Sequence, residues 1–316
     1  SAYKAQTEVW NGTNWTEDGD LSTARAALGS SGLSNTDALA FGGGNGSELA
    51  LTEEWTAAGA PIGAWSTGGT LNTARNGAGG AGTQTSALMF GGGPVKTGAT
   101  ESYDGTSWTE VNDLNTARSG GVGGAGADNT SAVAFGGEAT PGNTTDTETW
   151  NGSNWTEVNN MNTDKRNAAN AGIITSALVA GGQGPSVNMS QTEIWNGTNW
   201  TEVNDLNTAR RGLDGAGSTN TAAIAMGGYT TTFSADTELW NGTNWTEVNN
   251  LNTARSAGGS FGSSISALNF GGETPSVTVN TEEWNGATWV EVANLSTARG
   301  NGIMGAGANS TAGLAA

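Results

Sequence analysis

The 316-residue sequence has no cysteine and no histidine, and it has only 11 lysines and arginines against 29 aspartates and glutamates. Without cysteine it forms no disulfide bond. Without either residue it has no Ser-His-Asp triad, no thiolate nucleophile and no His or Cys zinc ligand. The net charge of -18 repels nucleic-acid phosphates and anionic membranes. We therefore expect no nucleic-acid partner, no metal and no other cofactor.

Long apolar runs are also missing. No stretch approaches the ~18 apolar residues that a membrane-spanning helix needs, and no charged-then-apolar signal segment opens the chain, so we expect no membrane insertion. Ser1 follows either a removed Met or a cleaved leader. Helix-forming Lys, Gln and Leu are scarce, whereas Gly (52 residues), Thr, Asn and Ser are abundant and disfavour helix interiors. The composition therefore favours strands joined by tight turns, with 13 tryptophans to supply a core.

A phrase of about 45 residues repeats along the chain. Each unit reads roughly TE-x-W-NGTN-W-TEVN-x-L-NTAR, followed by a Gly/Ala-rich run, by TSALAFGG and by a variable stretch. The seven units begin near residues 7, 52, 100, 147, 192, 237 and 281. Such a period is typical of propellers and other repeat architectures.

Within a unit, residues alternate with period 2 on both sides of Asn-Gly, which is a hairpin signal. If Gly197 and Thr198 form the turn, Trp195 faces Trp200 directly across the hairpin. If Asn196 and Gly197 form it, the two rings are diagonal neighbours. In both cases the large rings lie on adjacent strands. The recurring Asn-x-Thr sequons in this phrase are either glycosylation acceptors or hairpin turns, and the repetition favours turns.

Four short strands in a unit of this length predict one propeller blade. Small-residue runs such as GAGGAG (77–82) suit the innermost strand, where space is least, and the tryptophans suit the outer strands. The last unit stops at Ala316, and the residues before Thr7 complete its length. We predict an all-β, single-domain chain over residues 1–316: a seven-bladed β-propeller of four-stranded blades, closed by N- and C-terminal strands that share one blade.

The order of Arg, small strand, apolar strand ending in Gly-Gly and two aromatic strands resembles the kelch repeat. One copy reads Arg25…Phe41-Gly42-Gly43…Trp55…Trp65, and six clear copies cover the chain. The resemblance implies that the strand after Arg is innermost. The galactose oxidases among kelch propellers need His and a Cys-Tyr crosslink, which this chain lacks. The phrase NGTNWTEVNDLNTAR is also similar to propeller repeats of phage and marine-virus structural proteins.

The regular residues of the phrase indicate a framework. All 13 tryptophans fall in the two aromatic positions of each unit, and Tyr103 fills the fourteenth. We expect each phrase-ending Arg to tie its blade to a neighbour through a Glu of the same period; the alternative is an anion-binding Arg ring at the axis. The residues predicted to be structural are Trp10, Trp15, Trp195, Trp200, Trp240, Trp245, Arg25, Arg75, Arg118, Arg210, Arg255 and Arg299.

The segments after Gly-Gly differ in every unit, and in the kelch arrangement they lie on one face of the disc. Variable loops on a rigid scaffold often serve recognition, although neutral drift would produce the same variation. The candidate binding residues in these segments are Asn45, Ser47, Glu48, Lys96, Glu138, Thr140, Asn143, Asn188, Tyr229, Phe233, Glu273 and Thr274.

These features predict a non-enzymatic structural or binding protein on a virion or extracellular appendage, used for attachment or particle decoration. Its partners would be other protein subunits of an assembly, or a cell-surface glycan or receptor. The alternative is a secreted or cell-surface carbohydrate-binding module. A third hypothesis is a hydrolase with paired carboxylates, since Asp and Glu alone can cleave glycosides; Asp214 is the off-pattern inner-strand acid that it would use.

Overall fold

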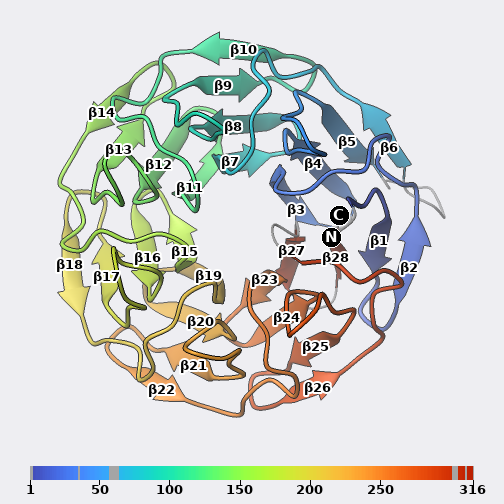
Figure 1. Ribbon diagram of the computed structural model, residues 1–316, viewed down its shortest axis with the longest axis vertical. Helices are drawn as coiled ribbons and strands as arrows, with labels where there is room; N and C mark the ends of the chain where they lie inside the picture. The colour runs from blue at the N-terminus through green and yellow to red at the C-terminus, as the bar shows by residue number, and fades with distance from the viewer. Residues whose placement is uncertain (1–2, 35, 57–63, 301–304, 310–311, 316) are drawn as a thin grey trace.

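The computed structural model describes residues 3–34, 36–56, 64–300, 305–309 and 312–315. In this part of the chain, 28 strands form four-stranded antiparallel sheets. The sheets stand as blades around a central axis, as Figure 1 shows. The prediction of an all-β propeller with four-stranded blades is therefore confirmed.

Six blades each consist of four consecutive strands, with the first strand nearest the axis (Figure 1). Their bounds are β3 (Gly29–Ser34), β4 (Asp37–Phe41), β5 (Thr52–Thr56) and β6 (Ala64–Thr67); β7 (Gly79–Thr83), β8 (Ser86–Phe90), β9 (Thr100–Tyr103) and β10 (Trp108–Val111); β11 (Gly123–Asp128), β12 (Ser131–Phe135), β13 (Thr147–Trp150) and β14 (Trp155–Glu157); β15 (Ala169–Ile173), β16 (Ser176–Ala180), β17 (Thr192–Trp195) and β18 (Trp200–Val203); β19 (Asp214–Thr219), β20 (Ala222–Met226), β21 (Thr237–Trp240) and β22 (Trp245–Glu247); and β23 (Gly259–Ser263), β24 (Ser266–Phe270), β25 (Thr281–Trp284) and β26 (Trp289–Glu291).

A further sheet joins the two ends of the chain. Its strand order is β2 (Trp15–Asp18), β1 (Thr7–Trp10), β28 (Ala312–Ala315) and β27 (Gly305–Asn309). Glu8 of β1 lies opposite Ala315 of β28. Residues 301–304, 310–311 and 316 lie outside the described part, so this blade is described only in part, and the count of seven complete blades stays a prediction.

The innermost strands are rich in glycine because the neighbouring strand fills the space. Gly123 of β11 lies opposite Phe135 of β12, and a Cβ placed on Gly123 would come within 2.2 Å of the ring. Gly29 and Gly79 face Phe41 and Phe90 in the same way. In the blade β15–β18 both partners are small, with Ala169 opposite Ala180. The size of the residue that can occupy the first position of an inner strand therefore depends on the size of the residue opposite it.

The outer hairpins place their aromatic rings directly opposite each other. Trp195 pairs with Trp200, with ring centroids 5.5 Å apart, so the direct arrangement is the correct one of the two alternatives. The Oδ1 atom of Asn196 accepts hydrogen bonds from the backbone N–H groups of Thr198 and Asn199, both at 2.9 Å. The asparagine of the repeated NGTN sequence thus closes the turn. The side chain of Trp65 lies outside the described part.

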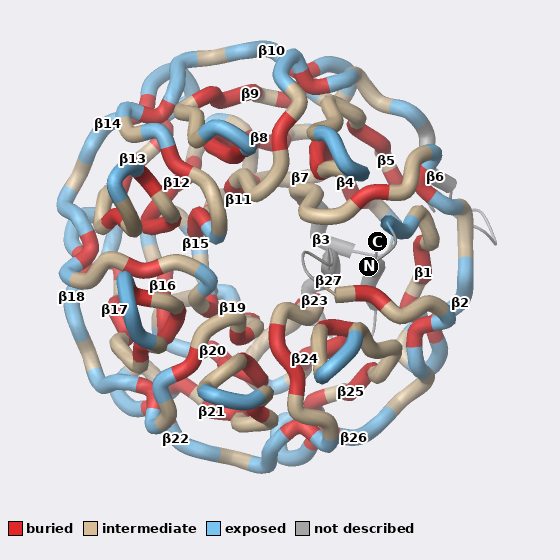
Figure 2. The backbone as a smooth tube through the Cα atoms, viewed as in Figure 1, coloured by how far each residue is buried: buried red, intermediate tan, exposed pale blue. Residues whose placement is uncertain are grey.

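Each described outer tryptophan also reaches the preceding blade. The Nε1 atom of Trp200 donates to Thr147 Oγ1 at 2.9 Å, and the ring meets Phe135 edge to face at a centroid distance of 5.0 Å. Such aromatic pairs contribute about 0.5–1.5 kcal/mol beyond the area that they bury. Clusters of buried residues, such as Phe135 with Trp195 and Trp200, lie between neighbouring blades. Figure 2 shows that the outer rim is mostly exposed.

The phrase-ending arginines form buried ion pairs. Arg210 Nη1 lies 2.5 Å from Glu238 Oε1, and both side chains are almost completely excluded from solvent. Lys165 takes the same position in the fourth unit, 3.5 Å from Glu193; burial lowers the pKa of its ammonium group, and Glu193 opposes that shift. The other pairs are Arg25–Glu53, Arg75–Glu101, Arg118–Glu148, Arg255–Glu282 and Arg299–Glu8.

The same glutamates hold the loop before each arginine. Glu238 accepts hydrogen bonds from the backbone N–H and from the Nδ2 of Asn207, both at 2.7 Å. The Glu lies on the third strand of the blade that the loop enters, so the ion pair fixes each connection between two blades to the blade that follows it.

Candidate functional site: the axial cavity

A cavity of about 660 Å³ lies at the axis, on the face that carries the loops after Gly-Gly. We call it the axial cavity. Backbone segments that precede the inner strands form its mouth, and the β20–β21 loop contributes Tyr229 and Phe233. Its size is within the range of small-molecule sites, which is about 300–1,000 Å³.

The mouth is formed by residues in the left-handed backbone region. Ala27, Asn167 and Ala257 have φ of 54°, 52° and 50°, and Gly77 and Gly212 have similar values. Backbone hydrogen bonds link several of them from blade to blade; Gly212 donates to Asn167 O and Ala257 donates to Gly212 O, both at 2.9 Å. Non-glycine residues in this region cost about 1–3 kcal/mol, and they occur where the surroundings hold them firmly.

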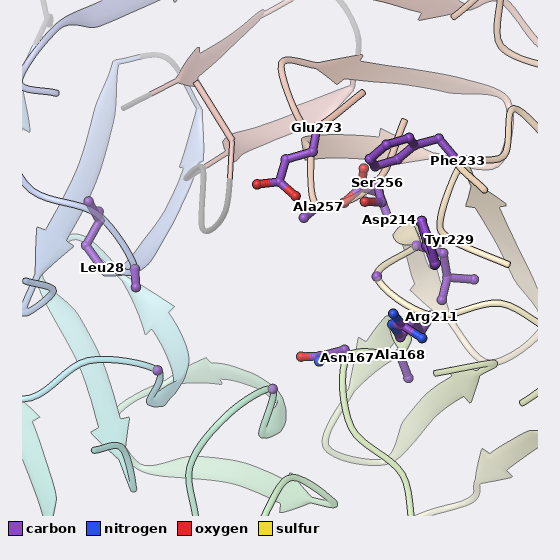
Figure 3. A pocket seen from close by; sticks show the side chains of 15 residues that line it. Leu28, Asn167, Ala168, Arg211, Asp214, Tyr229, Phe233, Ser256, Ala257 and Glu273 are labelled. Carbon is purple, nitrogen blue, oxygen red and sulfur yellow. The ribbon is translucent and has the colours of Figure 1, made fainter. Parts of the chain in front are cut away.

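The wall of the axial cavity differs between its two sides. Small and apolar residues such as Leu28, Gly77 and Gly121 form one side, whereas polar and aromatic side chains from the blades β19–β22 and β23–β26 form the other. Figure 3 shows Leu28 apart from the others, with Arg211, Tyr229 and Asp214 on the opposite side. Contacts for a polar ligand are therefore concentrated in one sector, which we call the polar sector.

Arg211 is held in place within the polar sector. Its guanidinium carbon lies 4.8 Å from the centroid of the Tyr229 ring, and its Nη1 donates to Asn188 Oδ1 at 3.0 Å. Asn188 in turn donates through Nδ2 to the carbonyls of Tyr229 and Thr230, both at 2.8 Å. The Tyr229 ring meets Phe233 edge to face, with centroids 5.4 Å apart. None of the ion pairs among the described residues includes Arg211.

Asp214 is one of the two carboxylates of this sector, and Glu273 is the other. Its Oδ2 accepts a hydrogen bond of 2.8 Å from Nδ2 of Asn269, a fully buried residue on the adjacent blade. Burial raises the pKa of Asp214 to about 6, and the Asn269 hydrogen bond, the charge of Arg255 and the Gly258 N–H oppose this shift. The site therefore combines a guanidinium, two carboxyl groups and two aromatic rings.

The structure places the sequence candidates in different environments. Tyr229, Phe233 and Glu273 line the axial cavity, as does Asp214. Glu138 and Asn143 line a second depression of about 420 Å³. The other candidates, which line neither cavity, are Asn45, Ser47, Glu48, Lys96, Thr140, Asn188 and Thr274.

An ion cluster between three blades lies beside the second depression, which its members Glu138 and Arg166 line. Lys96 Nζ lies 3.0 Å from Glu138 Oε1, and Arg166 pairs with the other oxygen of the same carboxylate. The hydrogen bond from Lys96 lowers the pKa of Glu138. Both cations share this one carboxylate, so the cluster joins the loops of adjacent blades.

Sequence reasoning missed Arg211, Asn167 and Asn269. A signal for Arg211 was present, because the residue after the phrase-ending basic residue is uncharged in every unit except at Arg166 and Arg211. Asn269 likewise stands where the other described second strands have Ala, Val or Met. Comparing the units position by position for departures would have identified both.

The described residues contain no group of three or more Asp and Glu side chains arranged to hold a metal ion. They also contain no helix of the length and apolar character required to cross a membrane.

Comparison with known proteins supports the fold. No protein-family profile matches the sequence, and no curated protein matches it. Among solved structures, the fold is similar to the one titled "Structure of YjhT", with a TM-score of 0.65 and 15% sequence identity; the match covers 85% of this chain and 98% of that chain. At this identity the likeness shows the fold alone, so the chain is a β-propeller whose function must be argued from its own site.

Proposed function

We propose that this chain is a non-enzymatic binding propeller that recognises its partner at the axial cavity and the loops around it. We further propose that the ring is closed, seven-bladed and kelch-like, with β1, β2, β27 and β28 forming the closing blade. The observation that supports binding is the gathering of Arg211, Asp214, Tyr229 and Phe233 on one wall of the axial cavity, while the described residues of the opposite wall are small or apolar.

The framework suits a rigid display role. Buried ion pairs fix the connections between blades, and tryptophans join each blade to the preceding one. The charge of -18 keeps copies of the disc apart in solution. Together with the phage-like style of the repeats, this supports a protein of a virion or extracellular appendage that serves in attachment or decoration, with other subunits or a cell-surface glycan or receptor as partners.

Mass spectrometry of particles and filaments purified from the source culture tests this location. We expect peptides of the chain to copurify with particles through a density gradient, and antibodies against the disc to label intact particles. Recovery of the chain only from the soluble contents of cells would contradict the proposed location.

A secreted or cell-surface carbohydrate-binding module is the second candidate. The edge-to-face pair of Tyr229 and Phe233 beside hydrogen-bonding groups favours it. A positive glycan array together with absence from particles would favour this candidate over the first.

A catalytic role is not part of the proposal. The Asp214 carboxylate is held by a hydrogen bond from a buried carboxamide, Asn269, and Glu273 lines the same cavity as the second carboxylate that a paired arrangement for glycoside cleavage would need. The test is to measure turnover of aryl glycosides by the intact chain. Turnover that disappears in an Asp214→Asn variant would overturn the proposal of a non-enzymatic role.

A further inference from the structure

Several departures of the chain from its own repeat lie at the polar sector. The units that begin at Thr192 and Thr237 have nearly the same phrase, TEIWNGTNWTEVNDLNTAR and TELWNGTNWTEVNNLNTAR. The strands and loops that follow these phrases carry Arg211, Asp214, Tyr229 and Asn269, none of which has the same residue at its position in the other units, except that Arg166 matches Arg211. The framework residues are thus repeated from unit to unit, whereas these residues at the cavity differ between units.

These departures are sterically coupled. Asp214 lies opposite Met226, at the position where four other blades have Gly opposite Phe. A side chain at that position would collide with the Phe ring, as the distance of 2.2 Å at Gly123 shows. The flexible Met226 leaves space for the carboxylate, so Asp214 required a matching change on the adjacent strand.

The polar pair also extends across two blades. Asn269 is completely buried on β24, and its amide holds the Asp214 carboxylate of β19. A buried amide at a position that is otherwise apolar costs free energy, unless it is hydrogen-bonded. Asn269 Oδ1 has no hydrogen-bond partner among the described residues, so part of this cost remains uncompensated. If Asn269 had only a structural role, an apolar residue such as those of the other blades would stabilise the fold more.

The chemistry of the polar sector is balanced between donors and acceptors. Arg211 presents a planar fork with five N–H donors, of which the Asn188 bond uses one. Asp214 presents acceptors, and Glu273 and Ser256 lie on the same wall. The Tyr229 ring and the Phe233 ring add apolar surface. An anion would meet two carboxylates and a strongly acidic protein, and a cation would meet Arg211, so the arrangement suits a neutral ligand with many hydroxyl groups.

We propose that the polar sector binds the pyranose ring of a neutral saccharide, with ring hydroxyls hydrogen-bonded to Arg211 and Asp214 and an apolar face of the sugar against Tyr229 or Phe233. This inference rests on the proposed function, because it names the ligand of the proposed cavity. It assigns Arg211 as the residue that determines specificity, since its donor fork is fixed by both Asn188 and the Tyr229 ring.

The test is a glycan array with matched neutral and uronic-acid termini, followed by titration calorimetry of the intact chain with the neutral glycan that binds best. We expect neutral termini to bind more tightly than their uronic-acid counterparts. Arg211→Met should weaken binding by about tenfold or more, because a hydrogen bond to a charged group contributes about 1.5–3 kcal/mol. Asp214→Asn should also weaken binding. Thr231→Ala, an exposed position in the β20–β21 loop that does not line the cavity, is the matched control and should bind like the wild type.

Near-ultraviolet circular dichroism of the tryptophan bands shows whether each variant is folded, and Arg211→Lys replaces Arg211→Met if the latter is not. Preference for uronic acids, equal affinity of the Arg211 and control variants, or binding of no saccharide would each overturn the inference. None of these outcomes affects the copurification test. The proposed function is therefore tested independently of the saccharide inference.

Discussion

The carboxylate of Asp214 on β19 accepts a 2.8 Å hydrogen bond from the buried carboxamide of Asn269 on β24, so one polar contact joins the inner regions of two adjacent blades. In the other blades the position of Asp214 is occupied by Gly or Ala, and the position of Asn269 is occupied by an apolar residue. This pair makes both the stability and the cavity sensitive to the charge of one side chain.

Stability should therefore depend on the protonation of Asp214. Its folded pKa of about 6 lies above the ordinary value of 3.8, so the folded state binds the proton more tightly than the unfolded state. The resulting stabilisation is present below about pH 4 and is lost as the pH rises through about 6. We expect the free energy of unfolding of the wild type, relative to Asp214→Asn, to fall from pH 4 to 6 and then level off.

Urea unfolding followed by tryptophan fluorescence between pH 4 and 8 measures this difference. Glu247→Gln, at an exposed position on β22, is the control and should run parallel to the wild type. Parallel curves for wild type and Asp214→Asn would refute the assigned pKa.

Breaking a buried ion pair should be costly. Arg210→Met leaves the Glu238 carboxylate buried without its cation, and such losses cost about 3–5 kcal/mol. Adding Glu238→Gln should restore part of this loss, because the remaining charge is removed. The checks are thermal melting and a double-mutant cycle; an unchanged melting temperature for Arg210→Met would rule out a framework role for this arginine.

The contribution of the tryptophan hydrogen bond between blades to stability should be measurable separately from the contribution of ring packing. Trp245 Nε1 donates to Thr192 Oγ1 at 2.8 Å in a buried environment. Trp245→Phe should destabilise the fold by about 1–3 kcal/mol through the lost bond and reduced packing. In the background of Thr192→Val the same change should cost less. Equal costs in the two backgrounds, from chemical denaturation, would show that the bond contributes nothing.

Gly123 should tolerate a methyl group only when Phe135 is shortened. Gly123→Ala alone places its Cβ against the ring and should cost about 1–3 kcal/mol. In Phe135→Ala, which is itself destabilised, adding Gly123→Ala should cost little, because the pair then matches Ala169 opposite Ala180. Gly142→Ala, where nothing lies within 4 Å, is the control. Additive losses would contradict steric coupling.

The framework could be predicted from the sequence because each of its interactions is repeated. The period located the strands, the two tryptophans located the outer hairpin, and Arg and Glu recurring together indicated an ion pair. The site was harder to predict because its interactions are not repeated from unit to unit. Asn269 and Arg211 each carry chemistry that depends on one partner elsewhere in the ring, and only the spatial arrangement shows that β19, β24 and the β20–β21 loop meet at one wall.

The hairpin turn closed by Asn196 has a consequence for chemical ageing. Asn-Gly peptides are prone to lose ammonia, and Asp is one of the products. One unit already has aspartate at this position: Asp104 stands where five other units have Asn, and its Oδ1 accepts from the N–H groups of Thr106 and Ser107, both at 2.9 Å. These two hydrogen bonds lower the pKa of Asp104 and keep the carboxylate charged. Conversion of Asn to Asp in the sister turns would therefore leave the hairpins closed, whereas the isoaspartyl product, with its lengthened backbone, would not.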